Sequence, residues 1–127
     1  MKRLLMLRHA EAEPGSPDKD RKLTRKGRAD MQHLHRQLLA DNLMPQFALA
    51  SDAQRTQATL QHVTGPDFTG SDSNGVVAFT AALYNATAET IIHHVQLIDD
   101  QYQTALIVAH NPGIYQAVID LTRAADL

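Results

Sequence analysis

Short apolar runs alternate along the chain with longer segments in which apolar residues recur at helical spacing. Four runs have the length of strands buried in a parallel sheet, at 4–7, 47–50, 76–79 and 105–109. The helical spacing predicts helices over 25–40, 53–63 and 87–98, and a last one opened by Pro112. This alternation predicts an α/β fold, with three α/β/α layers and a mostly parallel central sheet.

Polar residues mark where these helices begin and where the chain turns. Three residues can cap the first turn of a following helix: Thr24, Asp52 and Asn111. Residues 11–22 and 64–75 are rich in proline, glycine and small polar residues, which predicts loops. Gly27 is unfavourable in the first turn of its predicted helix.

Composition fits a globular protein with one domain over residues 1–127. Hydrophobic residues make up 43% and charged residues 20% of the chain, which argues against disorder. The absence of cysteine excludes disulfides, thiolate nucleophiles and zinc sites built on cysteine. The net charge of −2 gives no bulk attraction to nucleic acid or to an anionic membrane. The first apolar run is too short for a signal peptide or a membrane span, so we expect a cytoplasmic protein.

Polar side chains cluster where three of the four predicted strands end. The clusters are Arg8-His9, Ser51-Asp52 with Arg55 one turn later, and His110-Asn111. Parallel strands bring these clusters to one edge of the sheet, together with the positive N-terminal ends of two helices. The sequence therefore predicts a locally cationic rim that contains two guanidinium groups and two imidazoles.

Such a rim suits a phosphoryl group. Guanidinium groups bind phosphate oxygens in a bidentate manner, and helix N-termini offer free N–H groups. A neutral imidazole can attack phosphorus and carry the phosphoryl group as a covalent intermediate. Fixed positive charge then stabilises the transition state of the transfer.

The segments that carry these residues resemble the histidine phosphatase superfamily, whose fold is phosphoglycerate mutase-like. Leu7-Arg8-His9-Ala10 resembles its signature, with alanine where glycine is usual, and Ala50 to Thr59 resembles its second segment through Arg55-Thr56. Val108 to Gly113 resembles the segment of its second histidine, while Arg21 to Thr24 with Gly27, and Leu83-Tyr84, match less well. The similarity is greatest to the SixA-type branch, the protein phosphohistidine phosphatases.

The resemblance implies a role for each matching residue and a substrate class. His9 would be the nucleophile, and Arg8, Arg55 and His110 would hold the phosphate, with Asn111 beside them at the substrate. No cofactor is implied, and the substrate would be a phosphorylated protein histidine or a small phosphorylated molecule. Members of the family usually continue past the final helix into a further strand, so we expect this domain to lack that strand.

The resemblance leaves the proton donor open. Asn111 stands where one branch of the family has an acid, and Glu89 is the best remaining candidate, ahead of the group Glu11, Glu13 and Asp52. An alkyl phosphate needs a proton on its leaving oxygen, whereas phosphohistidine can leave as neutral imidazole. The lack of a clear proton donor therefore favours phosphohistidine over sugar phosphates as the substrate.

Other interpretations remain beside this one. The alternatives are a phosphatase for small phosphomonoesters and a phosphate-binding module without turnover. A metal shared by His9 and His110 is disfavoured because the two nearby arginines would repel a cation. The other five histidines are interpreted as surface or partly buried residues: His33, His35, His62, His93 and His94. No insertion long enough for a lid separates the strands, so we expect an open site.

Overall fold

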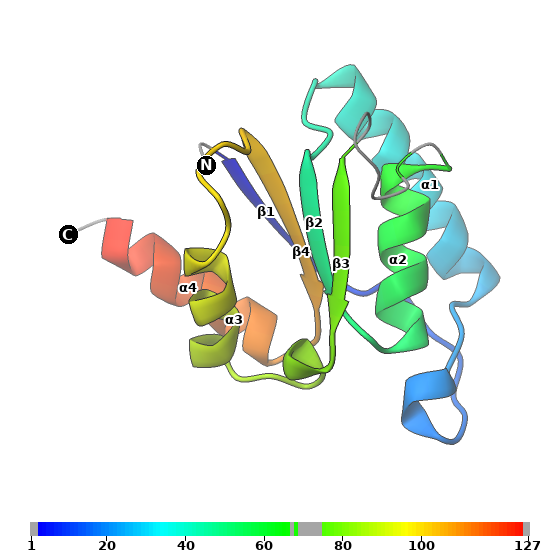
Figure 1. Cartoon of the computed structure of the whole chain (residues 1–127). Helices are drawn as coiled ribbons and strands as arrows, with labels where there is room; N and C mark the ends of the chain where they lie inside the picture. The colour runs from blue at the N-terminus through cyan, green and yellow to red at the C-terminus, as the bar shows by residue number, and fades with distance from the viewer. Residues whose placement is uncertain (1–2, 67, 69–74, 126–127) are drawn as a thin grey trace.

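A computed structural model describes residues 3–66, 68 and 75–125 of the chain. Residues 67 and 69–74 of the predicted loop lie outside this part. The four predicted strands form one sheet, in the order β1-β4-β2-β3 with every neighbouring pair parallel (Figure 1). Their bounds are Arg3–Arg8 for β1, Phe47–Ser51 for β2, Val76–Thr80 for β3 and Thr104–Ala109 for β4.

Helices cover both faces of this sheet. Those described are α1 (Arg25–Ala40), α2 (Gln54–Thr64), α3 (Ala88–Gln96) and α4 (Gly113–Ala125), with short 3₁₀ turns η1 (Asp18–Asp20) and η2 (Ala81–Leu83). Helices α1 and α2 pack side by side on one face, and α3 and α4 cover the other (Figure 1). The predicted three-layer α/β/α fold is therefore confirmed.

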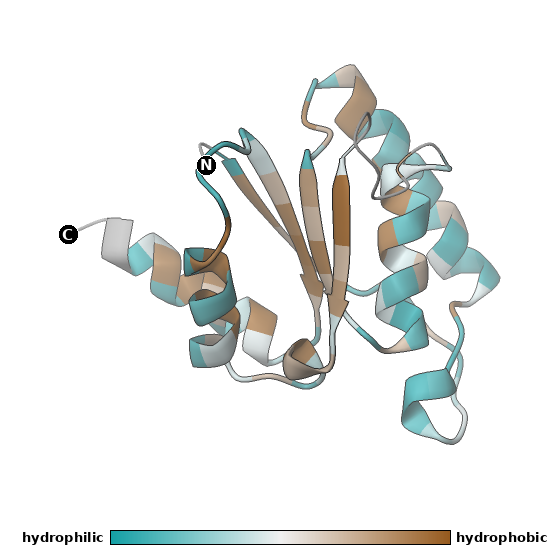
Figure 2. Cartoon of the chain, in the orientation of Figure 1, coloured by the Kyte–Doolittle hydropathy of each residue, from teal (hydrophilic) through white to brown (hydrophobic). Residues whose placement is uncertain are grey.

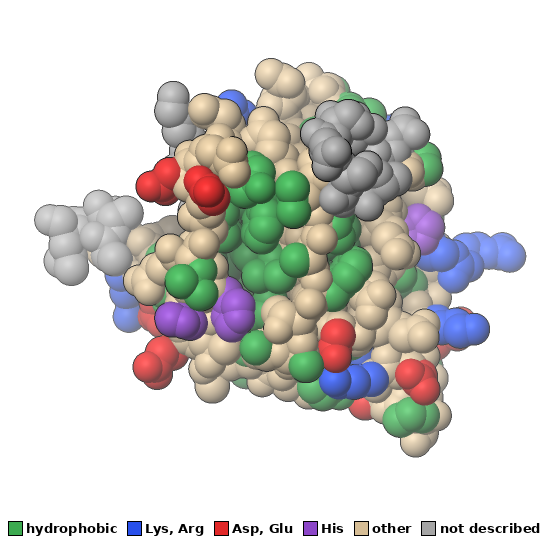
Figure 3. All heavy atoms as spheres, viewed as in Figure 1, with side chains coloured by type: hydrophobic (Ala, Val, Ile, Leu, Met, Phe, Trp, Pro, Cys, Tyr) green, Lys and Arg blue, Asp and Glu red, His purple; other side chains and the backbone are tan. Residues whose placement is uncertain are grey.

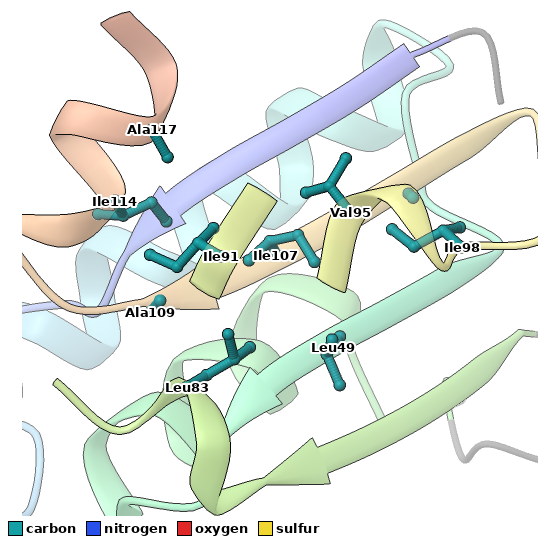
Figure 4. Packing of buried hydrophobic residues seen from close by; sticks show 10 residues of the cluster. Leu49, Leu83, Ile91, Val95, Ile98, Ile107, Ala109, Ile114 and Ala117 are labelled. Carbon is teal, nitrogen blue, oxygen red and sulfur yellow. The ribbon is translucent and has the colours of Figure 1, made fainter. Parts of the chain in front are cut away.

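The central strand β4 packs against the helices on both faces of the sheet. Every residue of β4 is buried, which is why its sequence is a continuous apolar run. Ile107 and its alternate neighbours pack under α3 and α4, while Leu106 and Val108 pack under α1 and α2. Figure 4 shows Ile91 of α3 lying close to Ile107. Two compact apolar layers thus fix the strand that leads directly to His110.

Hydropathy follows these layers. The strands are mostly hydrophobic, whereas the outer surfaces of α1 and α2 are largely hydrophilic (Figure 2). Figure 3 shows hydrophobic side chains gathered over the central strands between α3 and α2. The edge strand β1 is only partly buried. Within the described residues, no helix is long and apolar enough to span a membrane.

The predicted helix N-cap at Thr24 is confirmed, whereas the one at Asp52 is not. Thr24 accepts a hydrogen bond from the Gly27 N–H at 2.9 Å, as predicted. Helix α2 begins at Gln54 after Ala53, so the prediction that Asp52 caps it is wrong. The Asp52 carboxylate instead pairs with Lys19 at 3.0 Å. An ion pair to a distant loop has replaced the local cap.

Gly27 allows α1 to approach closely the segment that follows β1. A Cβ atom at this position would lie 2.3 Å from the carbonyl oxygen of Glu11. The first turn of α1 therefore packs directly against the segment that follows β1. This contact explains a glycine in a helical turn, and it fixes the path of the chain just after His9.

Candidate active site

The parallel register brings His9 and His110 together. Arg8 lies opposite Ala109 in the β1–β4 ladder, and the His9 N–H donates to the Ala109 carbonyl oxygen at 3.1 Å. The two imidazole ring centroids are consequently 5.4 Å apart. Two segments separated by a hundred residues thus meet at one edge of the sheet, as the sequence predicts.

His9 has one ring nitrogen engaged, and the other has no hydrogen-bond partner in the part of the chain that the structure describes. Its Nδ1 lies 2.8 Å from the carbonyl oxygen of Ala10, which can only accept a hydrogen bond. The proton must therefore sit on Nδ1, and Nε2 carries a free lone pair. Burial, followed by the charges of Arg55 and Arg8, lowers the pKa of His9 below its usual 6.5, against the raising effect of the Ala10 bond. The imidazole is neutral near pH 7, as a nucleophile requires.

Ala10 also anchors this loop to α2. Its N–H donates to Thr59 Oγ1 at 2.9 Å, and Thr59 in turn donates to the carbonyl oxygen of Arg55 at 2.6 Å. Both side-chain bonds are buried, so they are shielded from competition with water. The position of His9 is thereby linked to the helix that carries Arg55.

His110 has the opposite arrangement. It is 2% exposed, and its Nε2 lies 2.7 Å from Ser51 Oγ. Its Nδ1 lies 3.3 Å from Arg55 Nη2, which can only donate, so Nδ1 accepts and Nε2 carries the proton. Ser51 Oγ is 2.7 Å from Thr56 Oγ1, and Thr56 can donate to the Ser51 carbonyl oxygen at 2.9 Å. Burial and the charge of Arg55 lower the pKa of His110 to about 4.

Arg55 lies between His110 and the loop over residues 11–22, whose contacts the sequence does not predict. It is 3% exposed. Its Nη1 donates to the Asp18 carbonyl oxygen at 2.8 Å, and its Nη2 donates to Asp18 Oδ2 at 3.0 Å. Its Nε is buried and has no hydrogen-bond partner among the described residues. The guanidinium also lies 5.9 Å from the centre of the Tyr84 ring.

Asp18 and Tyr84 are the site residues that sequence reasoning missed. The Tyr84 hydroxyl donates to Asp18 Oδ2, and Arg21 Nη1 donates to Asp18 Oδ1 at 3.1 Å. These bonds, the one from Tyr84 first, hold the pKa of the Asp18 carboxyl well below its usual range. Asp18 has no local signal in the sequence, and Tyr84 appeared only in a weak family match. The expectation of an open site is wrong on this side, because residues of the loop lie over Arg55.

The remaining candidates lie further out. Arg8 is exposed at the end of β1, and its side chain makes no hydrogen bond or ion pair with the described residues. Asn111 is exposed and its Oδ1 accepts from the Tyr115 N–H at 3.2 Å, in keeping with its predicted capping position. Arg8 is thus free to meet a ligand, while Asn111 is already used by α4.

None of the acid candidates hydrogen-bonds to either histidine among the described residues, although the charge of Asp52 acts to raise the pKa of His110, against its overall lowering. Glu89 is exposed in the first turn of α3 and lines a separate hollow with His93 and Asp120. Glu11 Oε1 accepts from the Thr24 hydroxyl at 2.8 Å, and Asp52 is paired with Lys19. Glu13 is exposed, and the contact of this residue with the site runs through its backbone carbonyl and Arg21. Across residues 3–66, 68 and 75–125, no group of three or more potential metal-ligating side chains comes together.

Sequence comparisons find relatives without an assigned activity. No protein-family model matches the chain. An uncharacterised chloroplastic protein of Arabidopsis thaliana is 31% identical over 98% of this chain and 61% of its own length. An uncharacterised protein of Mycobacterium leprae is 35% identical over 58% of this chain and 41% of its own length. The chain thus spans less than two thirds of these curated relatives.

Structural comparisons are more informative. A candidate phosphohistidine phosphatase SixA from Agrobacterium tumefaciens has a TM-score of 0.81 at 26% identity, over 98% of this chain and 82% of its own. A second candidate SixA, from Nakamurella multipartitia, has a TM-score of 0.78 at 27% identity, over 89% and 61% of the two chains. The protein histidine phosphatase SixA complexed with tungstate shares the fold, with a TM-score of 0.76 at 20% identity.

Proposed function

Because the chain belongs to the histidine phosphatase superfamily, with SixA-type proteins among its structural neighbours, we propose that it is a phosphohistidine phosphatase. In this proposal it removes phosphate from a protein histidine through a covalent intermediate on His9. The supporting observation is the geometry of His9: its Nδ1 is engaged by the Ala10 carbonyl oxygen, its ring lies 5.4 Å from that of His110, and its Nε2 has no hydrogen-bond partner among the described residues.

The proposed reaction has two displacements at phosphorus. In the first, the lone pair of His9 Nε2 forms a bond to phosphorus while the P–N bond to the substrate imidazole breaks. Arg8 and Arg55 stabilise the negative charge on the phosphoryl oxygens. In the second, water attacks phosphorus, the P–Nε2 bond breaks, and the water proton leaves to solvent as inorganic phosphate forms. His9 returns to its neutral state with the proton still on Nδ1.

The proposed substrate class is supported by the lack of a protonated carboxyl group beside the two histidines among the described residues, because Tyr84 and Arg21 hold the pKa of the nearby Asp18 carboxyl well below its usual range. An alkyl phosphate leaves as an alkoxide unless the enzyme supplies a proton, whereas a phosphoramidate protonated on nitrogen leaves as neutral imidazole. Glu89 faces another hollow, and Asp52 is held by Lys19. The site therefore favours a phosphorylated histidine. No step needs a metal, so we expect full activity after treatment with EDTA.

Trapping the intermediate tests this function. A phosphohistidine-containing protein labelled with ³²P is mixed with the enzyme, and the reaction is quenched in alkali, in which phosphohistidine is stable. We expect label on a peptide that contains His9, and none in His9→Ala, which should fold normally because the residue ends a strand. His33→Ala is the matched control, since His33 is exposed on α1.

Three outcomes would contradict the proposal. Phosphate binding without a labelled His9 would indicate a binding module that does not turn over. Comparable turnover of a sugar phosphate and of phosphohistidine would indicate a small-molecule phosphomonoesterase. Loss of activity in EDTA would show that a metal takes part.

A further inference from the structure

Three of the five N–H donors of Arg55 are already engaged, among them both donors of Nη2, whereas Nε has no partner among the described residues. A guanidinium has five N–H donors, two on each terminal nitrogen and one on Nε. Both donors of Nη2 are engaged, one by Asp18 Oδ2 and one by His110 Nδ1, and Nη1 donates to the Asp18 carbonyl oxygen. The pair of terminal nitrogens, which normally forms two parallel bonds to a phosphate, is therefore spanned by Asp18.

Asp18 is well suited to imitate a phosphoryl group. Its carboxylate is anionic, its Oδ2 already accepts from Arg55 Nη2, and hydrogen bonds from Tyr84 and Arg21 strongly favour its deprotonated form. The Asp18 side chain is 44% exposed, whereas that of Arg55 is 4% exposed. The anion thus approaches from the solvent side, by which a substrate must also arrive.

The segment that carries Asp18 is held at its base by backbone pairing, whereas its tip takes part in no strand pairing within the described part of the chain. Residues 14–21, here called the strap, leave and return through an antiparallel bridge between Ala12 and Leu23 and a bond from the Glu13 N–H to the Lys22 carbonyl oxygen at 2.8 Å. Beyond this base, the strap is joined to α2 and its neighbours through the backbone carbonyl and carboxylate of Asp18 and through the side chain of Lys19. The tip can therefore separate from Arg55 without breaking the sheet or a helix.

We propose that the strap is a built-in competitor: Asp18 occupies the phosphate position on Arg55 in the free protein, and a phosphorylated substrate must displace it. This inference rests on the proposed function, because it takes Arg55 as a phosphate ligand. Because a phosphate must first displace Asp18 from Arg55, its affinity for the protein is lowered. The return of Asp18 to Arg55 then helps to expel the product. Asp18 is a regulatory residue in this scheme and does not act on the reacting atoms.

A simple positioning role predicts the opposite effect of a substitution. If Asp18 merely held Arg55 in place, its removal would loosen the guanidinium and weaken phosphate binding. If Asp18 competes, loss of its carboxylate frees the Nη2 donor that holds Oδ2 and strengthens phosphate binding, although the bond to the Asp18 backbone carbonyl remains. The sign of the change in phosphate affinity therefore distinguishes the two roles.

Calorimetric titration of the full chain with inorganic phosphate measures this sign without any turnover. We expect Asp18→Asn to bind phosphate roughly threefold to tenfold more tightly than the unmodified protein, as expected for the loss of one partly exposed charge-assisted contact. Asp18→Ala should bind at least as tightly. Tyr84→Phe, which removes a hydrogen bond that holds Asp18, should change affinity in the same direction and by less.

Asp20→Asn is the matched control, because Asp20 lies in the same strap, is exposed and carries the same charge. It should leave the phosphate affinity unchanged. Equal tightening in Asp18→Asn and Asp20→Asn would show a general charge effect and overturn the proposal, as would weaker or unchanged binding in Asp18→Asn. If no variant and no unmodified protein bound phosphate, the proposed function would fail together with this inference.

Discussion

Replacing Ser51 with alanine deletes one oxygen atom from the buried chain of hydrogen bonds behind His110. In the intact protein, Ser51 Oγ accepts the proton on His110 Nε2 at 2.7 Å, and both residues are almost completely buried. Alanine cannot accept, so the Nε2–H becomes a buried donor without a partner. The other ring nitrogen is also constrained, because a proton on Nδ1 would point at the N–H of Arg55. Neither neutral tautomer is then satisfied.

The size of the effect follows from the cost of that unpaired donor. Leaving a buried donor unsatisfied costs about 1–3 kcal/mol of unfolding free energy. For a domain of this size, that cost corresponds to a fall in Tm of roughly 4–12 °C. If the same free energy is lost from the transition state, kcat/KM falls by roughly 5-fold to 150-fold, since 1.36 kcal/mol is one factor of ten.

Three measurements test this prediction together. Thermal unfolding gives the stability, turnover of phosphohistidine gives kcat/KM, and ¹⁵N NMR of the imidazole nitrogens reports which nitrogen of His110 carries the proton. Thr64→Val is the matched control, because it deletes a buried hydroxyl whose only hydrogen bond within the described part of the chain is to the carbonyl oxygen of Leu60 in α2. It should leave kcat/KM and the His110 signals unchanged. Normal stability, normal turnover and an unaltered Nε2–H signal in Ser51→Ala would refute the assigned network.

Three further predictions concern pH, the two arginines and a glycine. His110 has a folded pKa of about 4 against 6.5 when unfolded, so the unfolded chain binds the proton first as pH falls. The contribution of neutral His110 to the free energy of unfolding is complete above pH 6.5 and should fall by roughly 3 kcal/mol towards pH 4. In urea unfolding, His110→Asn should lack this part of the pH dependence of stability. Arg8→Ala and Arg55→Ala should each reduce turnover by about 10²–10³, but only the buried Arg55 should also lower Tm, as parallel kinetics and melting will show. Gly27→Ala should strongly lower Tm through its clash with a loop carbonyl, whereas Gly15→Ala, whose Cβ would lie 3.7 Å from its nearest neighbour, should not.

The parts of the fold that the sequence predicts are those governed by local patterns. The apolar run at 105–109 is continuous because β4 is buried on both faces, so it was recognisable without the structure. The parallel order of the strands then brings His9 and His110 to one edge, and only the strand-end position of each residue was needed to infer it. Arg55 follows from the same reasoning, one turn into the helix after β2.

The parts that the sequence does not predict depend on contacts between loops far apart in the chain. Asp18 meets Arg55 across 37 residues and Tyr84 across 66 residues. No periodicity links such positions, and an aspartate within a polar loop is ordinarily a solvated residue. Asp52 failed as a cap for the same reason, because a partner outside its own helix, Lys19, competes for its carboxylate.

The two histidines show how one set of charges serves binding and reactivity. His9 keeps its proton on Nδ1 and presents Nε2, whereas His110 keeps its proton on Nε2 and turns Nδ1 towards Arg55. Burial, and after it the positive charge that would attract a phosphoryl group, lowers the pKa of both imidazoles, so His9, the proposed nucleophile, stays unprotonated without a dedicated base. A bound phosphate dianion opposes that charge and must raise both pKa values.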